Sequence, residues 1–380
     1  MSEVIVIPAL NPDRRLITLI DDLHDHGFET IFVVDDGSAE EYEPVFEQAR
    51  VAGARVLHHA CNLGKGVALK TAIMEVRRNL PSAERIITMD ADGQHLAKDA
   101  ARLAYASREN PEALILGTRD FKRYHVPLRS RFGNAFSAAY FKADTGVSCP
   151  DTQTGLRAIP ASMFAMAQAT PGMRYEFEMN FLTAVAKAGL ALEYVPIATI
   201  YERGNTTSHF SPVRDSVRIY AQLLRFAGSS LACSVVDLLI FALITTFVSL
   251  EAGLLITLAT VAARLCSGAL NFTLNRNWSF LDLGSLSGNA LRQAHRYLIL
   301  FVGLIIASST LVTLLSFLPL PLVGVKMIVD VALFTVSYFV QRNWVFKSTP
   351  EPTVPRTPIA PQTKGGVQRE QSTKHAVRSL

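Results

Sequence analysis

Four long apolar stretches fill most of the second half of the chain, and they constrain its fold more than any other feature. A helix needs about 20 mostly apolar residues to cross the hydrocarbon core of a bilayer. The chain of 380 residues is 49% hydrophobic and only 18% charged, which is too apolar for a protein that is soluble throughout. We therefore expect an all-α, four-helix transmembrane domain over 226–347, with spans at Phe226–Leu250, Leu254–Leu274, Tyr297–Leu318 and Leu322–Val340.

Basic residues are distributed unevenly among the connections between these stretches. Arg276, Arg292 and Arg296 lie between the second and third stretches, and Arg342 and Lys347 follow the fourth. The other two connections contain no Lys or Arg. Because basic loops remain on the cytoplasmic side of a membrane, we expect a multi-pass protein of the cytoplasmic (inner) membrane with both termini in the cytoplasm.

Two further segments flank the four stretches. Residues 211–225 alternate arginines with apolar residues, a pattern that predicts an amphipathic helix, either at the membrane interface or on the cytoplasmic surface. Residues 348–380 are rich in Pro, Thr and Gln with little to bury, which predicts a disordered cytoplasmic tail. The net charge is only +4, and without a stripe of basic and aromatic residues the sequence predicts membrane lipid as a partner and no nucleic acid.

A short motif is repeated in the transmembrane region. Arg-Asn-Trp occurs at 276–278 and again at 342–344, so each half is predicted to be a helical hairpin that ends in the same way, the two halves being related by an axis along the membrane normal. Arg264 lies 14 residues before Trp278, and Asp330 lies 14 residues before Trp344. Because a charge in lipid is costly unless it is paired, we expect Arg264 to face Asp330, with Asp237 and Lys326 as competing partners.

The first 210 residues have a different pattern, in which short β-rich runs alternate with amphipathic helical stretches. This alternation is typical of an α/β fold with a largely parallel sheet. The expected strands are Val4–Pro8, Thr30–Asp35, Arg55–Leu57, Arg85–Met89 and Leu114–Gly117. The expected helices are Leu16–His26, Tyr42–Ala52, Val67–Asn79 and Asp99–Glu109.

The strongest chemical signal is a pair of carboxylates, Asp90 and Asp92, directly after the fourth expected strand. Two aspartates at this spacing bind a divalent cation that neutralises a diphosphate. Three more polar loops, 8–12, 35–38 and 62–66, each follow an expected strand. Ligands of such sheets bind at the carboxyl ends of strands, so the four loops together predict a nucleotide site, although a glycine-rich turn such as 62–66 also serves as a simple helix cap.

These four motifs, in this order and spacing, resemble the family 2 glycosyltransferases of GT-A fold, in the branch that includes dolichol-phosphate mannose synthase. The resemblance implies a nucleotide-sugar pocket in which either Asp36 or Asp35 binds the base or ribose. The residues implied at that pocket are Pro8, Ala9, Asn11, Asp35, Asp36, Asn62, Lys65 and Asp90. It also implies Mg²⁺ or Mn²⁺, with Asp90, Asp92 and Gln94 as ligands.

Further along, arginines follow the fifth expected strand. In the enzymes that this chain resembles, arginines here clamp the phosphate of a lipid acceptor, which implies a catalytic role for Arg119 and Arg131; the alternative is that both are solvated surface charges. Forked guanidinium groups suit a phosphate, since it needs orientation and charge neutralisation more than a strong base. Asp151 resembles a position near the acceptor and either orients the acceptor, acts as a base, or holds a structural turn. Asp92 completes the expected catalytic group.

The membrane half, Phe226–Phe346, is similar to the GtrA-like proteins that serve polyprenyl-linked sugar metabolism. The combined resemblance implies an inverting, metal-dependent transfer of a sugar from a nucleoside diphosphate sugar to a polyprenyl (undecaprenyl) phosphate at the cytoplasmic face. The alternative is a membrane transporter or anchor for lipid-linked sugars with a degenerate nucleotide-binding domain. Assembly into a homo-oligomer is left open.

Overall fold

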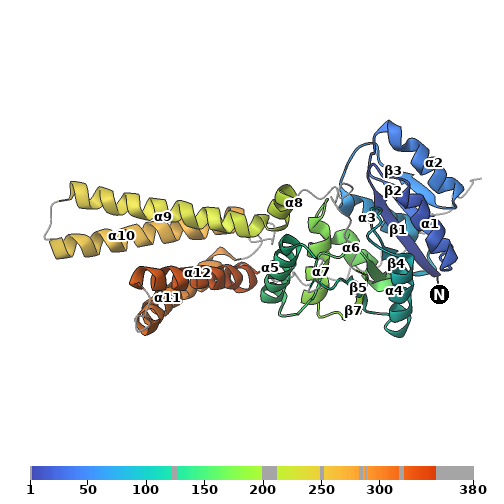
Figure 1. The fold of residues 1–380 in the computed structure, drawn as a ribbon. Helices are drawn as coiled ribbons and strands as arrows, with labels where there is room; N and C mark the ends of the chain where they lie inside the picture. The colour runs from blue at the N-terminus through green and yellow to red at the C-terminus, as the bar shows by residue number, and fades with distance from the viewer. Residues whose placement is uncertain are drawn as a thin grey trace, which may run out of the picture.

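The computed structural model describes residues 2–121, 126–198, 212–248, 252–281, 286, 289–315 and 321–347. An α/β domain comes first and two helical hairpins follow it, as Figure 1 shows. The predicted fold class is therefore confirmed. The expected tail, 348–380, lies outside the described residues, as do the ends of the first and third expected spans.

A sheet of seven strands forms the centre of the first domain, in the order β3-β2-β1-β4-β6-β5-β7. Only β6 runs antiparallel to its neighbours, so the carboxyl ends of β1 to β4 meet at one edge. The strands are β1 Ser2–Ala9, β2 Ile31–Asp35, β3 Arg55–His58, β4 Ala83–Thr88, β5 Leu114–Thr118, β6 Arg157–Pro160 and β7 Leu192–Pro196. The five strands expected from the sequence are all present, and β6 and β7 are additional.

Helices cover both faces of this sheet because its central strands are apolar on both sides. In β1, Val4 and Val6 pack on one face, whereas Ile5 and Ile7 pack on the other. One face is covered by α1 Arg15–Asp25, α2 Glu43–Val51 and α4 Ala97–Glu109. The other is covered by α3 Lys65–Asn79, α5 Leu128–Thr145, α6 Phe164–Ala169 and α7 Glu176–Lys187. Short 3₁₀ turns at Glu40–Tyr42 and Ala161–Met163 precede α2 and α6.

The helix between the two domains is shorter than expected. The sequence predicted one amphipathic helix over 211–225, but α8 covers Pro212–Ile219 and residues from Ala221 onward belong to α9. Tyr220 interrupts them with a non-helical backbone (φ −102°, ψ 14°). Its ring packs edge-on against Phe136 and Tyr140 of α5, at centroid distances of 5.1 and 5.4 Å. Contact with the first domain therefore ends the helix earlier than its sequence pattern indicated.

The second domain consists of two hairpins. The helix α9 (Ala221–Phe247) pairs with α10 (Ala252–Leu274), and α11 (Ala290–Leu315) pairs with α12 (Leu322–Val340). Among the described residues, α9 and α11 are long and apolar enough to cross a membrane, with mean hydropathies of 2.1 and 2.5. Few or none of the residues in their apolar windows are buried here, as expected for helices that face lipid.

The repeated motif forms the same unusual structure twice. Each hairpin ends in one turn of π-helix, η3 Asn275–Ser279 and η6 Gln341–Val345. The first residues of these turns meet, since Asn275 Nδ2 donates to Gln341 Oε1 at 3.0 Å in a buried position. The rings of Phe280 and Phe346 also stack on each other, at 5.2 Å. Equivalent residues of the two repeats thus contact one another across an approximate two-fold axis.

The charged residues inside the hairpins pair differently from the expectation. Among the described side chains, the acidic partner of Arg264 is Asp237, with Nε 3.8 Å from the carboxylate. Ser267 also donates to Asp237, at 2.8 Å. The expected pairing of Arg264 with Asp330 is therefore corrected to the competing pair, because α9 and α10 lie side by side within one hairpin.

Buried charges join the two domains. Asp144 of α5 is almost fully buried and contacts Lys187 of α7 at 2.9 Å and Arg342 of η6 at 2.8 Å. The hydroxyl of Tyr140 lies 2.9 Å from that of Tyr338, and Arg342 donates to both. The equivalent arginine of the first repeat behaves differently, since Arg276 donates to Gln293 of α11 at 2.9 Å. Within the part of the chain that the structure describes, the α/β domain is held by the arginine of the second repeat, Arg342.

Candidate active site

A cavity of about 490 Å³ opens where β1, β2, β3 and β4 end. All four polar loops that the sequence singled out contribute to its wall. The lining residues are Pro8, Ala9, Leu10, Asn11, Pro12, Asp13, Arg15, Asp36, Tyr42, Asn62, Gly64, Lys65, Asp90, Ala91, Asp92, Arg174 and Tyr175. Nearly all of the predicted nucleotide residues therefore lie together, because parallel strands end at the same edge of a sheet.

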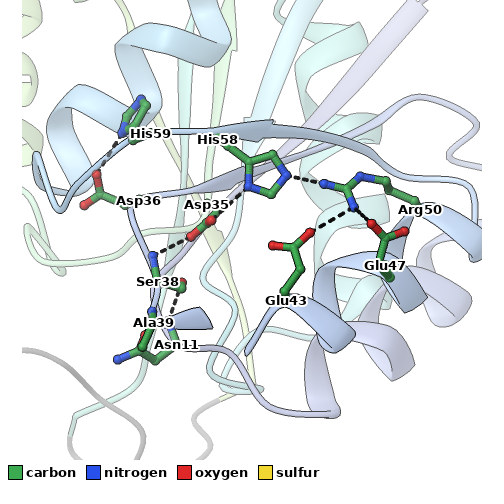
Figure 2. Close-up of polar contacts among 10 residues, drawn as sticks. All are labelled: Asn11, Asp35, Asp36, Ser38, Ala39, Glu43, Glu47, Arg50, His58 and His59. Carbon is green, nitrogen blue, oxygen red and sulfur yellow. Dashed lines mark hydrogen bonds and ion pairs between the residues drawn. The ribbon is translucent and has the colours of Figure 1, made fainter. Parts of the chain in front are cut away.

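The first two loops hold each other in place. Asn11 has a left-handed backbone (φ 46°), a conformation that asparagine tolerates better than most residues. Its amide donates to Ser38 Oγ at 2.8 Å, and its side-chain carbonyl accepts from the Ala39 amide at 3.0 Å (Figure 2). Asn11 thus lines the cavity and ties β1 to the loop after β2.

The two adjacent aspartates of that loop have separate tasks. Asp35 is buried and accepts from the Ser38 amide at 2.8 Å and from His58 Nδ1 at 2.9 Å. Arg50 contacts the other nitrogen of His58, so the chain of contacts ends on the outer helix α2, as Figure 2 shows. Asp35 does not line the cavity in the part of the chain that the structure describes, so Asp36 is the better candidate for the predicted contact with the nucleotide.

Asp36 also shapes the glycine-rich loop. Its carboxylate accepts from the amides of Leu63 and Gly64, at 3.0 and 2.8 Å, and from His59 Nδ1 at 2.9 Å. A side chain at Gly37 (φ 73°) would meet the backbone of Cys61 at 2.2 Å, so only glycine allows the two loops to approach this closely. The loop 62–66 is therefore more than a helix cap.

His59 belongs to none of the sequence motifs, and its side chain is buried between the two loops and α3. Its second nitrogen, Nε2, lies 3.0 Å from Thr71 Oγ1. The one signal in the sequence is its position directly after a strand whose parallel neighbour ends in two aspartates. His59 is a positioning residue, since it fixes the carboxylate of Asp36 without lining the cavity.

We expect His59→Gln to weaken donor binding more than His59→Asn does. Asparagine places its amide close to the position of Nδ1 and retains the bond to Asp36, whereas glutamine reaches toward Nε2 and loses it. A hydrogen bond to a charged group contributes about 1.5–3 kcal/mol, so KM for the donor should rise by about tenfold or more in the glutamine variant while kcat changes little. Equal KM values in the two variants would argue against this role.

Asp90 is held by a buried lysine. Lys65 Nζ lies 2.6 Å from Asp90 and 3.1 Å from Glu178, which the sequence analysis did not identify. Burial raises the pKa of Asp90, but the charge and hydrogen bond of Lys65, together with His95 and Arg119, outweigh burial and lower that pKa to about 2. Burial likewise opposes the charge of Lys65, yet the two carboxylates keep the pKa of Lys65 above its usual value. The pair is thus fully charged at neutral pH.

Asp92 also lines the cavity, but its surroundings change its pKa in the opposite direction. Burial, followed by the charge of Asp90, raises the pKa of Asp92 to about 6. Its Oδ1 accepts from the backbone amide of Gln94 at 3.0 Å. Burial also lowers the pKa of the neighbouring His95 to about 4, so this histidine is neutral and its Nδ1 accepts from the Asp90 amide at 3.1 Å. Asp92 is therefore the carboxylate most in need of a cation.

The residues at this edge fit a divalent cation that arrives with a diphosphate. Within the described residues, no group of three or more His, Cys, Asp or Glu side chains is arranged to hold a metal. Asp90 and Asp92 are two carboxylates beside an open cavity, and Mg²⁺ is commonly bound by one or two carboxylates together with substrate phosphates. Gln94 donates its backbone amide to Asp92. Its side chain stays a predicted third ligand of the cation.

Two of the predicted acceptor residues, Arg119 and Asp151, lie beside this cavity rather than in its wall. Arg119 forms a two-pronged ion pair with Asp151, with Nε and Nη2 at 2.8 and 3.1 Å from the two carboxylate oxygens. Asp151 is fully buried, which suits a residue that orients Arg119 better than it suits a base. The charge of Arg119 also contributes to the low pKa of Asp90. Arg131 is exposed on α5 and is not part of this group.

Comparison with known families and proteins agrees with this arrangement. Residues 4–164 match glycosyl transferase family 2, and residues 225–346 match the GtrA/DPMS transmembrane domain. An uncharacterised protein of Methanocaldococcus jannaschii is 32% identical over 52% of this chain and 81% of its own length. The UDP-N-acetylglucosamine–dolichyl-phosphate N-acetylglucosaminyltransferase of Methanococcus voltae is 26% identical over 52% of this chain and 85% of its own length.

Among solved structures, glucosyl-3-phosphoglycerate synthase from Mycobacterium tuberculosis, in complex with Mn²⁺, UDP-glucose and phosphoglyceric acid, is 17% identical. The match covers 59% of this chain and 77% of that one, with a TM-score of 0.45. The first match lies within the α/β domain that holds the cavity, and the second covers the apolar hairpins. The chain is a glycosyltransferase that belongs to family 2 and carries a GtrA/DPMS transmembrane domain.

Proposed function

We propose that the protein transfers a sugar from a nucleoside diphosphate sugar to a polyprenyl phosphate at the cytoplasmic face of the membrane, with inversion and with the aid of Mg²⁺ or Mn²⁺. The observation that carries this proposal is the cavity in which Asn11, Asp36, Lys65, Asp90 and Asp92 converge, on a domain joined to membrane hairpins. The relative from Methanococcus voltae is named for a dolichyl-phosphate acceptor, which supports a lipid phosphate here.

The donor fits the cavity with its nucleoside toward β1 and β2 and its diphosphate toward Asp90 and Asp92. Asn11 and Asp36 are fixed by hydrogen bonds within the protein, so they offer the nucleoside a preformed surface. A bound divalent cation would supply the positive charge that stabilises the leaving diphosphate. Where the cavity wall consists of glycine and other small residues, the backbone can approach the phosphates of the donor closely.

The acceptor requires orientation rather than a strong base. The second pKa of a phosphate monoester is about 6, so the acceptor oxygen is largely ionised at neutral pH. Arg119, held by Asp151, is a fixed guanidinium beside Asp90 that is suited to a phosphate. Attack on the sugar from the side opposite the diphosphate inverts the anomeric centre.

The exposed face of α5 supports delivery of this acceptor from the membrane. Leu128 and Phe132 are one helical turn apart and 78% and 76% exposed, and the same helix reaches the membrane domain through Asp144 and Arg342. Arg131 lies between these apolar residues in sequence and remains our candidate for a contact with the lipid phosphate. We further propose four membrane crossings with both termini cytoplasmic, because η3 and η6 meet at the end of the bundle that holds the α/β domain.

Purified protein in detergent should transfer label from one of a panel of UDP- and GDP-linked radioactive sugars to undecaprenyl phosphate. We expect the labelled lipid to disappear with EDTA and to return with excess Mg²⁺ or Mn²⁺, and undecaprenol without the phosphate to accept nothing. Label that is insensitive to EDTA would contradict the metal dependence. No lipid label from any donor would contradict the proposed reaction and favour a transporter or anchor with a degenerate nucleotide site.

A further inference from the structure

Lys65 lies where a cation would neutralise Asp90. It is the first residue of α3, and its ammonium group is 2.6 Å from Asp90 Oδ1 and 3.1 Å from Glu178. Its side chain is only 13% exposed, although it lines the cavity. Three charges are thus gathered beside Asp92 before any ligand arrives.

Asp90 has little freedom to offer another oxygen. A Cβ atom at Gly155 would lie 2.4 Å from Asp90 Oδ2, so this oxygen packs directly against the backbone of the neighbouring strand connection. The amide of Asp90 is fixed by His95. The oxygen that contacts Lys65 is therefore Oδ1, and an incoming cation has to compete with the lysine for Asp90.

We propose that Lys65 is a positioning residue that withholds Asp90 from divalent cations until the nucleoside diphosphate enters the cavity. The diphosphate gives the ammonium group a new anionic partner, and Glu178 retains it nearby, so that Asp90 is released as the donor binds. Cation and donor then bind with strong mutual enhancement, and the coupling is equal in both directions. This inference rests on the metal dependence in the proposed function.

Removing the charge of Lys65 should have two opposite effects. Without it, the carboxylates of Asp90, Asp92 and Glu178 lose their nearest positive charge, so the site attracts a divalent cation more strongly in the absence of nucleotide. The diphosphate, by contrast, loses a buried cation that would bind it. A merely structural lysine would weaken both ligands together or neither.

The test is a titration of the full-length protein with Mn²⁺, followed by electron paramagnetic resonance, with and without saturating UDP or GDP. We expect Lys65→Met to tighten nucleotide-free Mn²⁺ binding by about tenfold or more and to weaken the nucleoside diphosphate, so that the enhancement by nucleotide shrinks. Lys65→Gln is a second neutral variant that keeps polar contacts with both carboxylates if the methionine variant does not fold. Lys65→Arg keeps the charge and should resemble the wild type.

Lys70→Met is the matched control, because Lys70 lies on the same helix and contacts the carbonyl oxygen of Gly172 rather than a carboxylate. It should change both affinities by less than about twofold. Unchanged nucleotide-free Mn²⁺ affinity in a folded neutral variant of Lys65 overturns the inference and leaves the proposed function intact. Wild-type protein that binds no Mn²⁺ even with nucleotide overturns the metal dependence itself, and the role of Lys65 with it.

Discussion

Asp92→Asn should reduce sugar transfer by about a thousandfold, since loss of a group that stabilises a leaving diphosphate costs several kcal/mol of transition-state stabilisation. Asparagine has nearly the same volume and still accepts from the Gln94 amide, so the fold should not change. What it loses is the negative charge that faces the cavity. The measurement is kcat/KM for labelled lipid product, together with the thermal midpoint of unfolding.

Asp25→Asn is the matched control for this substitution. Asp25 is exposed at the end of α1, and it does not line the cavity, so its loss of charge should alter transfer by less than about twofold. If Asp92→Asn retains more than a tenth of the wild-type rate while Asp25→Asn is unaffected, the role assigned to the carboxylate of Asp92 is wrong.

Arg342→Gln should loosen the contact between the two domains. Removing one member of a buried ion pair costs about 3–5 kcal/mol, and here the buried Asp144 would lose Arg342 while it keeps Lys187. We expect faster hydrogen exchange in α5 and η6 and a lower unfolding temperature in detergent or nanodiscs. The glutamine fills much of the space, so the effect reports the lost charge more than a lost contact surface.

The internal repeat supplies the control for this variant. Arg276 occupies the equivalent position in the first repeat, and the contact described for its side chain is a hydrogen bond to Gln293 of α11. Arg276→Gln should therefore leave hydrogen exchange in α5 unchanged. Equal protection of α5 in both variants would show that the ion pair with Asp144 does not hold the domains together.

Features that depend on local pattern were predictable from the sequence. The buried runs Val4–Pro8 and Leu114–Gly117 are apolar on both faces and mark strands, and the loops after strands mark the cavity. The repeat of Arg-Asn-Trp predicted a duplicated hairpin, which the contacts between η3 and η6 bear out. In each case short-range chemistry and sheet geometry decide the outcome.

Contacts between residues that are far apart in the sequence were much harder to predict. Lys65 and Glu178 are 113 residues apart, and nothing local in either segment indicates that they meet. The assignment of Arg264 failed because spacing within a repeat says which positions are equivalent but not which helices lie side by side. Asp35 and Asp36 are indistinguishable in sequence, and only the parallel register with His58 and His59 separates the buried support from the cavity wall.

The approximate two-fold axis of the membrane domain bears on stoichiometry. A bundle of two matching hairpins presents two similar ends of π-helix, and in principle each could seat a catalytic domain. Arg276 contacts Gln293 of the other hairpin, whereas Arg342 reaches a buried aspartate of the catalytic domain. The molecule therefore carries one catalytic domain on a nearly symmetric membrane domain. The difference between the contacts of the two arginines determines where the catalytic domain is attached.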